Sequence, residues 1–339
     1  SLEQPHASAD NIIEAVNNDQ SFANLASAHV SYASSDRAVA TVSRDGTVTA
    51  AAPGVTTISV TVNGVTGSTP LSVSAPLSAA APADMDAGAA SQATTSFTNT
   101  GSQPLTDVRL TLAGPDGWTA APATAATFAS IAPGQKVETT WNVTVPAGTG
   151  PGTYELAANA TFAAVSGPGS SSTAATTFVP GTVSVTLGQQ NQSSGLSQVE
   201  FDSGDGATQP VTVGGESGRE AVPTVPPHPN DLNIYFNVAD GVAFDGNYTA
   251  TFSIQYYDSG TGAFTPQYDS TNAKGGDVSG AYTDAPPVQL TNSGTWKTAT
   301  FTVHDAMFAN RENDGTDFRL SSPNSFTVHQ VSVTISANS

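Results

Sequence analysis

Short segments in which apolar and polar residues alternate run through most of the chain, and they limit its fold more than any other feature. Residues 29–74 contain the runs VATVSRDGTVTA and TTISVTVNG, with turn signals at Arg44-Asp45-Gly46, Pro53-Gly54 and Asn63-Gly64. Alternation with period two places the apolar side chains on one face of a strand. Short strands at regular spacing between turns are typical of a β-sandwich.

The rest of the sequence repeats this pattern, so an all-β chain is predicted. Thr and Val are abundant and favour strands, while 31 Gly and 22 Pro supply turns. A length of 339 residues suggests two or three domains. We expect three tandem β-sandwiches, two immunoglobulin-like and one jelly-roll-like, over residues 1–76, 77–180 and 181–339.

One segment, residues 9–25, departs from the strand pattern and predicts a short N-terminal helix. Asp10 would be its N-cap. Its apolar residues recur at a spacing near 3.6 residues: Ile12, Ile13, Val16, and Phe22 or Leu25.

The charge balance excludes some partners. The chain has 28 acidic and nine basic residues, a net charge of −19, so it repels nucleic acid and anionic lipid. No apolar run approaches the roughly 20 residues of a membrane span, so no membrane insertion is expected. Acidity suits a secreted or cell-surface protein; it is explained by solubility or by calcium binding. The absence of cysteine excludes disulfides and thiolate chemistry.

The chain opens with SLEQPHASADN, without an initiator Met or a signal peptide. It is therefore expected to be a piece of a longer or processed polypeptide.

The first predicted sandwich carries a specific motif. Tyr32-Ala33-Ser34-Ser35-Asp36 is followed by VATVSRDGTVTA and then by PGVTTISVTVNG. In these residues the segment 28–75 resembles the bacterial immunoglobulin-like group 2 domain. The resemblance implies an architectural role, as a spacer or an adhesin module.

A second resemblance follows an expected Ala- and Pro-rich linker at residues 75–88. The runs NTGSQPLTDVRLTL, PDGW and IAPGQKVETTWNVTVPAGTGPGTYEL resemble the NPCBM-associated domain of α-galactosidases. This family implies an accessory module of carbohydrate-active enzymes. Trp118 and Trp141 would be sugar platforms or core residues, and core is favoured because such rings are usually buried. Residues 166–175 are expected to form a connecting loop.

In the third predicted sandwich, the run YYDSGTGAFTPQYDS raises the question of a catalytic acid pair. Alternation along YTATFSIQYYD assigns Tyr256 to the core and Tyr257 to the opposite face. Glycines at 260 and 262 predict a hairpin turn. Asp258 and Asp269 then lie near the ends of the hairpin, and nothing fixes the separation of ~5 or ~6.5–9.5 Å that a glycosidase requires. Asp258 is interpreted as a turn residue.

This run occurs with YFNVADGVAFDG and SGTWKTATFTVHDAMFANRENDGTDFRLSS. Together they resemble the C-terminal modules of secreted bacterial glycoside hydrolases, over residues 196–336. The resemblance implies a carbohydrate-binding-like sandwich without chemistry of its own.

Sugar binding needs a ring face and polar side chains that pair with hydroxyls. The candidates are Tyr257, Tyr282, Arg219, Asn310, Arg311 and Arg319. Oxygen-bearing side chains near the same loop, and one near the first strand of this sandwich, could instead hold a structural calcium ion. These metal candidates are Glu200, Asn313, Asp314 and Asp317. The third interpretation is that the arginines pair with acids and hold the loop in place.

No GxSxG, phosphate-binding Gly loop or HExxH is present, and no catalytic centre is recognised. Whether the chain is itself an enzyme therefore stays open. The sequence predicts the non-catalytic accessory region of a secreted polysaccharide-degrading glycoside hydrolase. It would act in spacing, in docking to a polysaccharide or oligosaccharide, or in supporting a catalytic domain of the same enzyme. The alternatives are a cell-surface adhesin or stalk, and a chain associated with a separate catalytic chain.

Overall fold

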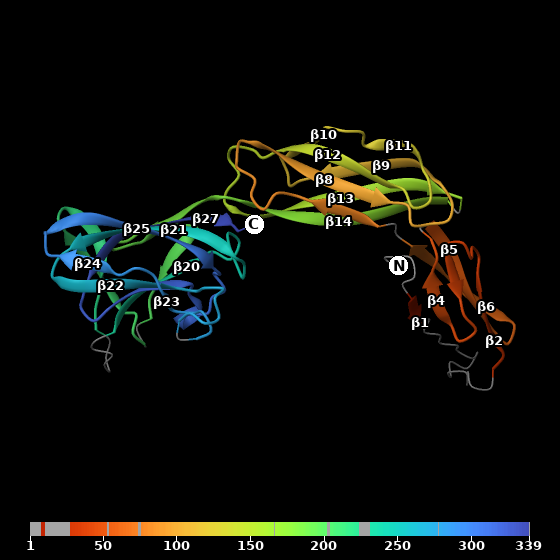
Figure 1. The fold of residues 1–339 in the computed structure, drawn as a ribbon. Helices are drawn as coiled ribbons and strands as arrows, with labels where there is room; N and C mark the ends of the chain where they lie inside the picture. Colours follow the sequence, from red (N-terminus) through yellow and green to blue (C-terminus); the bar gives the residue numbers. More distant parts are fainter. Residues whose placement is uncertain are drawn as a thin grey trace. The chain divides into compact units, whose positions relative to one another are not determined.

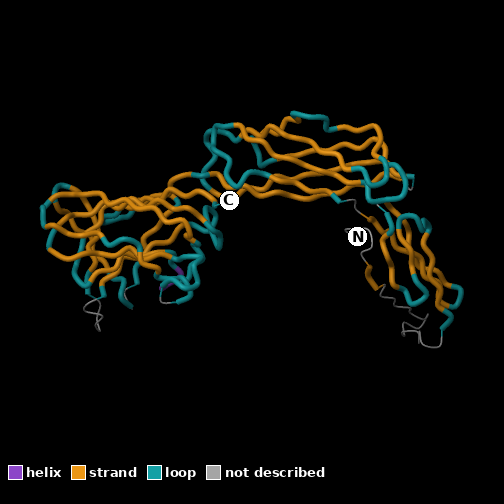
Figure 2. Tube along the Cα trace, viewed as in Figure 1, coloured by secondary structure: helices purple, strands orange, loops and turns teal. Residues whose placement is uncertain are grey.

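The computed structural model describes residues 8–10, 28–52, 54–73, 76–165, 167–201, 204–223, 231–276 and 278–338 (Figure 1). Strands connected by loops make up almost all of this part of the chain (Figure 2). The described residues contain no α-helix and one short 3-10 turn at Asn313–Gly315. The all-β prediction is confirmed, and no helix of the described residues is long and apolar enough to cross a membrane.

The predicted helix at 9–25 falls mainly outside the described residues. Its expected first residues, Ala9 and Asp10, lie in strand β1 (Ser8–Asp10), which pairs antiparallel with β4 (Thr47–Ala50). These two residues are therefore not helical, because their backbone groups belong to a sheet.

Contacts divide the chain into two compact units. The first contains Ser1–Pro82, Ala90–Val145 and Glu155–Thr176, and the second contains Ala83–Ala89, Pro146–Tyr154 and Thr177–Ser339. The boundaries of the three expected domains stay a prediction.

In the first unit, the segment 28–73 together with β1 forms two three-stranded sheets, in the orders β1-β4-β3 and β2-β5-β6. The remaining strand bounds are β2 (Val30–Ser34), β3 (Ala40–Val42), β5 (Gly54–Val62) and β6 (Val65–Val73). The strands bury a small core of Val39, Ala40, Val48, Ala50, Ile58 and Val73. Burial alternates along β4 and the first half of β5, and these strands produce the predicted buried face.

Two further four-stranded sheets have the orders β10-β12-β8-β7 and β11-β9-β13-β14. Their strands are β7 (Leu77–Ala80), β8 (Ala90–Thr98), β9 (Leu105–Ala113), β10 (Thr119–Pro122), β11 (Thr127–Ile131), β12 (Lys136–Thr144), β13 (Gly152–Ala164) and β14 (Gly167–Val179). Trp141 is buried and its Nε1 donates to Thr95 Oγ1 at 2.9 Å, as a core residue should. Trp118 is only partly buried, against Gly114.

Two loop predictions in this region are wrong. The expected linker at 75–88 contains β7, which pairs with β8, and the buried side chain of Met85. The expected loop at 166–175 lies within β14 from Gly167 onward. Ala, Ser and Gly resemble linker composition, but here sheet pairing satisfies their backbone groups.

The last part of the second unit is a sandwich of a seven-stranded and a six-stranded sheet. The seven-stranded sheet contains β15 (Gly181–Thr186), β16 (Gln192–Ser194), β18 (Thr208–Val213), β19 (Glu216–Ala221), β21 (Tyr248–Asp258), β25 (Thr295–Ala306) and β27 (Thr327–Ala337). The six-stranded sheet contains β17 (Leu196–Val199), β20 (Leu232–Val238), β22 (Thr261–Tyr268), β23 (Thr283–Asp284), β24 (Val288–Thr291) and β26 (Phe318–Ser322). Its jelly-roll connectivity stays a prediction.

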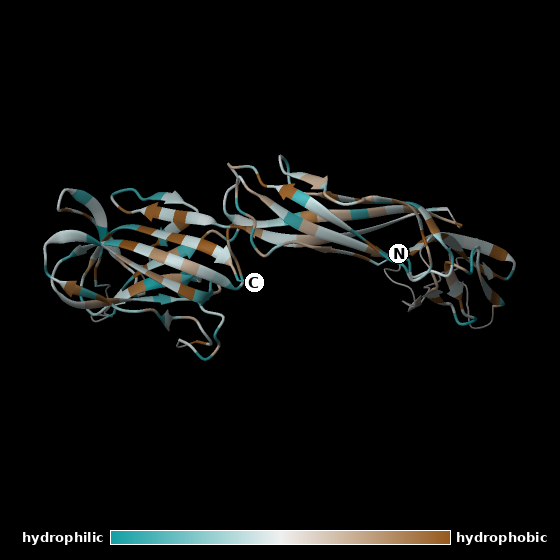
Figure 3. Cartoon of the chain, turned by 45° about the horizontal axis from the view of Figure 1, so that its top comes forward, coloured by the Kyte–Doolittle hydropathy of each residue, from teal (hydrophilic) through white to brown (hydrophobic). Residues whose placement is uncertain are grey.

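One continuous core joins these two sheets. Phe252 of β21 meets Phe318 of β26 edge to face, with ring centroids 5.0 Å apart. Hydrophobic and hydrophilic residues alternate along the strands (Figure 3). Burial alternates strictly along β21, so Tyr256 is buried and Tyr257 is partly exposed, as predicted.

The predicted hairpin between β21 and β22 is wrong. The two strands belong to opposite sheets, and the turn at 260–262 carries the chain across the sandwich. Gly260 and Gly262 adopt the positive φ values of 78° and 107° that the turn needs. Tyr256 and Phe264 both point inward and meet at 5.3 Å between centroids. Facing sheets allow this contact because each strand presents its apolar residues to the same core.

Candidate functional site

A polar network lies buried on the side of the six-stranded sheet that faces away from the core. Tyr235 points opposite to its neighbours Ile234 and Phe236 in β20, yet it is fully buried. Its hydroxyl donates to Asp205 Oδ1 at 2.9 Å and accepts from Arg319 Nη1 at 2.8 Å. Burial raises the pKa of Tyr235, so the hydroxyl keeps its proton and remains a donor.

Arg319 of β26 is at the centre of this network. Its guanidinium lies 4.4 Å from the centroid of the Tyr282 ring, and its Nη1 is 3.4 Å from Asp205 Oδ2. The Tyr282 hydroxyl donates to Asn313 Oδ1 at 2.9 Å and accepts from Asn313 N at 2.8 Å. The structure therefore brings together the predicted sugar contacts Tyr282 and Arg319 and the predicted metal ligand Asn313, but these side chains contact one another.

Arg311 is held in a second cluster. Its Nε donates to Asp269 Oδ1 at 2.8 Å, and its Nη2 also pairs with this carboxylate. The guanidinium donates further to the carbonyl oxygens of Ser270 at 2.7 Å and Ser279 at 3.0 Å. Asp269 is fully buried, and its Oδ2 accepts from Ala309 N at 2.9 Å. Arg311 thus ties two loops to a buried acid.

Two further buried acids lie in the same loop region. Asp317 accepts from the backbone N–H groups of Val238 at 2.9 Å and Asn310 at 3.0 Å, and burial raises its pKa to about 7. Glu312 accepts from Tyr282 N at 3.2 Å through Oε1, while Oε2 has no hydrogen-bond partner. Burial raises the pKa of Glu312 well above its ordinary value. Asn310 donates to Asp240 Oδ1 at 3.0 Å.

Asp258 has a different structural role from Asp269. Its carboxylate accepts from the backbone N–H groups of Thr291 at 2.6 Å and Ser293 at 3.1 Å, and it pairs with Lys297 at 2.6 Å. The hydrogen bond from Lys297 holds the pKa of Asp258 well below its usual range. The sequence suggests that Asp258 caps its own turn. In the structure its carboxylate caps the turn after β24 instead. Each of these two aspartates is neutralised by its own cation.

Arg219 and Glu200 form an ion pair elsewhere, near β18 and β19. Glu200 also accepts from Thr208 N at 3.0 Å and from Gln198 Nε2 at 3.1 Å. Arg219 donates to Thr208 and Gly188 besides this acid. Arg219, a predicted sugar contact, and Glu200, a predicted metal ligand, therefore form an ion pair with each other.

Three of the four predicted calcium ligands make hydrogen bonds or ion pairs within the protein. Asp317 and Asn313 use their side-chain oxygens in hydrogen bonds within the protein, and Glu200 belongs to the separate ion pair. Across the described residues, no group of three or more His, Asp or Glu side chains has an arrangement that could hold a metal ion. The four candidates thus do not form one ligand set, and calcium binding stays an untested prediction.

Tyr257 lies on the outer face of the seven-stranded sheet, away from the loop candidates. Its ring meets Trp296 edge to face at 5.3 Å, and Trp296 meets His329 at 5.6 Å. Trp296 Nε1 donates to Val213 O at 3.1 Å, and all three rings are partly exposed. We name this set the aromatic strip.

Sequence reasoning missed Trp296 and His329. A signal was present for Trp296, because it shares its strand face with Thr298 and Thr300 rather than with buried Val303. It also missed Asp205 and Tyr235, whose roles depend on Arg319 more than 80 positions later.

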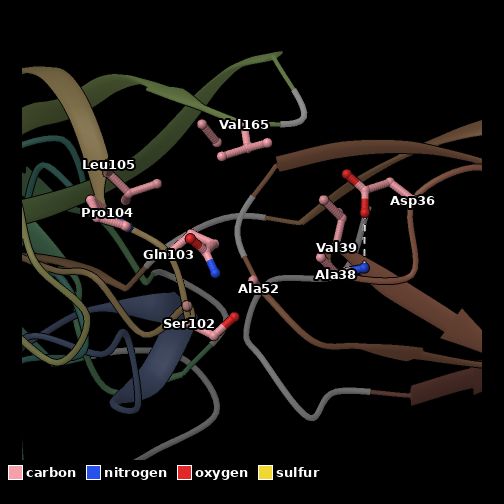
Figure 4. Close-up of a pocket in the computed structure, with 11 residues that line it drawn as sticks. Asp36, Ala38, Val39, Ala52, Ser102, Gln103, Pro104, Leu105 and Val165 are labelled. Carbon is pink, nitrogen blue, oxygen red and sulfur yellow. Dashed lines mark hydrogen bonds between the residues drawn. The ribbon is translucent and has the colours of Figure 1, made fainter.

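A pocket of about 120 Å³ lies within the first unit (Figure 4). Apolar and small residues line most of it. Its one ionisable lining residue, Asp36, uses Oδ1 to accept from Ala38 N at 2.9 Å. This lining offers no cluster of reactive groups.

Family profiles match two segments of the chain. Residues 16–73 match the bacterial Ig-like domain (group 2), and residues 85–163 match the NPCBM-associated, NEW3 domain of alpha-galactosidase. Both resemblances expected from the motifs are therefore confirmed. No curated protein matches the chain significantly.

Solved structures give weaker likenesses. Domains 4 and 5 of the S-layer protein SbsC are 15% identical, with 49% of this chain and 78% of that one covered and a TM-score of 0.20. A family 123 glycoside hydrolase from Clostridium perfringens is 10% identical, with 31% and 27% covered and a TM-score of 0.22. The K1 cleaved adhesin domain of Lys-gingipain from Porphyromonas gingivalis W83 is 14% identical, with 47% and 99% covered and a TM-score of 0.27.

Proposed function

We propose that this chain is the non-catalytic accessory region of a secreted glycoside hydrolase, and that residues 181–338 dock onto carbohydrate. The match of residues 85–163 to the NEW3 domain of alpha-galactosidase carries the proposal. The proposal is also supported by the two aspartates for which the sequence raised the question of a catalytic pair. Asp258 and Asp269 are each buried beside a cation, and neither is free to donate a proton to a glycosidic oxygen.

The segments before residue 181 would space the docking sandwich from a catalytic domain or from a separate catalytic chain. Short antiparallel sheets with polar outer faces suit this role, because they need no partner to cover them. The bacterial Ig-like match favours a second candidate, a cell-surface adhesin or stalk. The two candidates differ in whether the chain binds carbohydrate without any other domain.

The test is a binding experiment with the full 339-residue chain. Pull-down on insoluble plant, fungal and bacterial polysaccharides and affinity electrophoresis in soluble ones would show retention on at least one neutral polymer. Retention on none refutes docking and favours the stalk. Incubation with the retained polymer should release no reducing sugar, and release that Asp258→Asn abolishes would contradict the non-catalytic assignment.

A further inference from the structure

The outer face of strands β15, β27, β21 and β25 carries a regular array of uncharged polar side chains. In the first row, Thr182, Thr334, Thr251 and Thr302 lie directly opposite one another on successive strands. The hydroxyl oxygens of Thr182 and Thr334 are 2.8 Å apart, and those of Thr251 and Thr302 are 2.9 Å apart. The row thus forms a line of hydroxyls across four strands.

The second row repeats this arrangement two residues along each strand, with Ser184, Ser332, Ser253 and Thr300. All four are exposed or partly exposed, and hydroxyls in such positions keep donors and acceptors for an external partner.

The third row consists of Thr186, Gln330, Gln255 and Thr298. Strand geometry spaces neighbouring positions at about 4.8 Å between strands and about 6.7 Å between rows. The array is therefore a grid of hydroxyls and amides with two fixed repeats.

The absence of charge from this grid needs an explanation beyond strand propensity. Propensity accounts for Thr on strands, but exposed faces of soluble proteins usually carry charged residues as well. Exposed positions on β12 include Lys136 and Glu138, and those on β9 include Asp107 and Arg109. The chain as a whole has a net charge of −19. The uncharged grid is thus complementary to a neutral, hydroxyl-rich partner.

The aromatic strip borders one end of the grid. Tyr257 follows Gln255 on the same face of β21 and lies opposite Trp296 of β25. His329 precedes Gln330 at an irregularity of β27, where the register against β21 shifts. Partly exposed rings beside hydroxyl and amide groups are the combination that contacts both the C–H face and the hydroxyls of a sugar.

We propose that a neutral polysaccharide chain lies on this grid, with a sugar residue against the aromatic strip. The proposal rests on the docking function above and assigns it to the outer face of the seven-stranded sheet, not to the site of Arg311 and Arg319. Hydroxyls and amides of the grid exchange hydrogen bonds with sugar hydroxyls, and the missing charge avoids the cost of desolvating ions.

The experiment introduces charge into the grid of the full-length chain. Thr300→Glu with Gln330→Glu changes two exposed side chains on strands that do not neighbour each other, so the fold should be retained. Thr119→Glu with Gln92→Glu is the matched control, on exposed positions of β10 and β8, which are likewise separated by one strand of their sheet in the first unit. The polymer is the one that the unmodified chain binds in the test above. Soluble and insoluble forms are compared to distinguish a single chain from a polymer surface.

We expect the grid variant to lose at least tenfold in affinity and the control to change less than twofold, with equal circular dichroism and melting temperatures. Equal binding by the grid variant overturns this surface while leaving the docking function intact. Absence of binding by the unmodified chain overturns both. If light scattering shows a dimer of the unmodified chain that the grid variant disrupts, the occupant is a second copy and the proposal is wrong.

Discussion

Removing the charge of Arg311 is the sharpest test of the buried ion pairs. In Arg311→Met, the alkyl stem stays in place while Asp269 loses its cation and the carbonyls of Ser270 and Ser279 lose a donor. Breaking a buried pair from one side costs about 3–5 kcal/mol, because a charge is left unpaired in a dry environment. The side chain of Asp269 is 0% exposed and that of Arg311 is 31% exposed, so we expect a value near the low end, about 3 kcal/mol.

That loss corresponds to a fall in melting temperature of roughly 6–12 °C for a unit of this size. Scanning calorimetry would measure it in the transition of the second unit. Hydrogen exchange read by mass spectrometry should show faster exchange in peptides covering 278–284 and 305–317. The double variant Arg311→Met with Asp269→Asn should be more stable than Arg311→Met alone, because the unpaired charge is gone.

Two results would contradict this role of Arg311. A cost below about 1 kcal/mol would mean that water or another group already solvates Asp269, as for an exposed pair. A double variant less stable than the single one would mean that the Asp269 carboxylate is held by its backbone contacts rather than by Arg311.

Four further predictions follow from the same unit and from one turn of the first unit. Because the pKa of Asp317 is raised to about 7 from an ordinary 3.8, and that of Glu312 is also raised, the native state binds more protons than the unfolded state between about pH 4 and 7. Unfolding free energy should therefore fall as pH rises through this window, by up to about 1.4 kcal/mol per pH unit from Asp317, with Glu312 acting in the same direction, and Asp317→Asn should flatten the slope in urea titrations. Gly280→Ala should cost about 2 kcal/mol or more by urea denaturation, since φ is 105° and a Cβ would lie 2.3 Å from Ser270 O; Gly64→Ala, at φ 89° with open space, should cost only about 1 kcal/mol. Asp258→Asn should lower the melting temperature of the second unit, because an amide cannot accept from Thr291, Ser293 and Lys297 together; an unchanged melting temperature would contradict its capping role. If calcium binds near Asn313, Asp314 and Asp317, millimolar calcium should raise the melting temperature and chelation should lower it; no shift in either direction would exclude a structural ion there.

The sequence predicted the local structure of the sandwich well because side-chain alternation is a local property. The opposite faces of Tyr256 and Tyr257 followed from their positions in β21. Pairing between strands is not a local property, and the prediction of the pairing between β21 and β22 was wrong. The turn at 260–262 reads equally well as a hairpin or as a crossing between sheets, because two glycines permit both.

The candidate site shows the same limit. Arg311 and Arg319 look like ligand contacts in a loop rich in polar residues. Their partners Asp269 and Asp205 lie 42 and 114 positions away, so only the folded chain shows that they pair. Trp296 was identifiable in principle from the threonines that share its face. The regular grid was not, since it needs the register of four strands.

The pairing of β15 with β27 joins the first and last strands of the sandwich, with Thr182 and Thr334 separated by 152 positions. At a synthesis rate of about 5–20 residues per second, β15 is made some 8–30 s before its partner β27. Over this interval the edge of β15 that β27 later covers stays unpaired and open to mispairing with another nascent chain. Its threonines and serines bind water instead of adding a hydrophobic edge. A chain shortened before β27 should therefore remain soluble yet be cleaved rapidly by protease after residue 180, whereas resistance to cleavage would show that the sheet closes without its last strand.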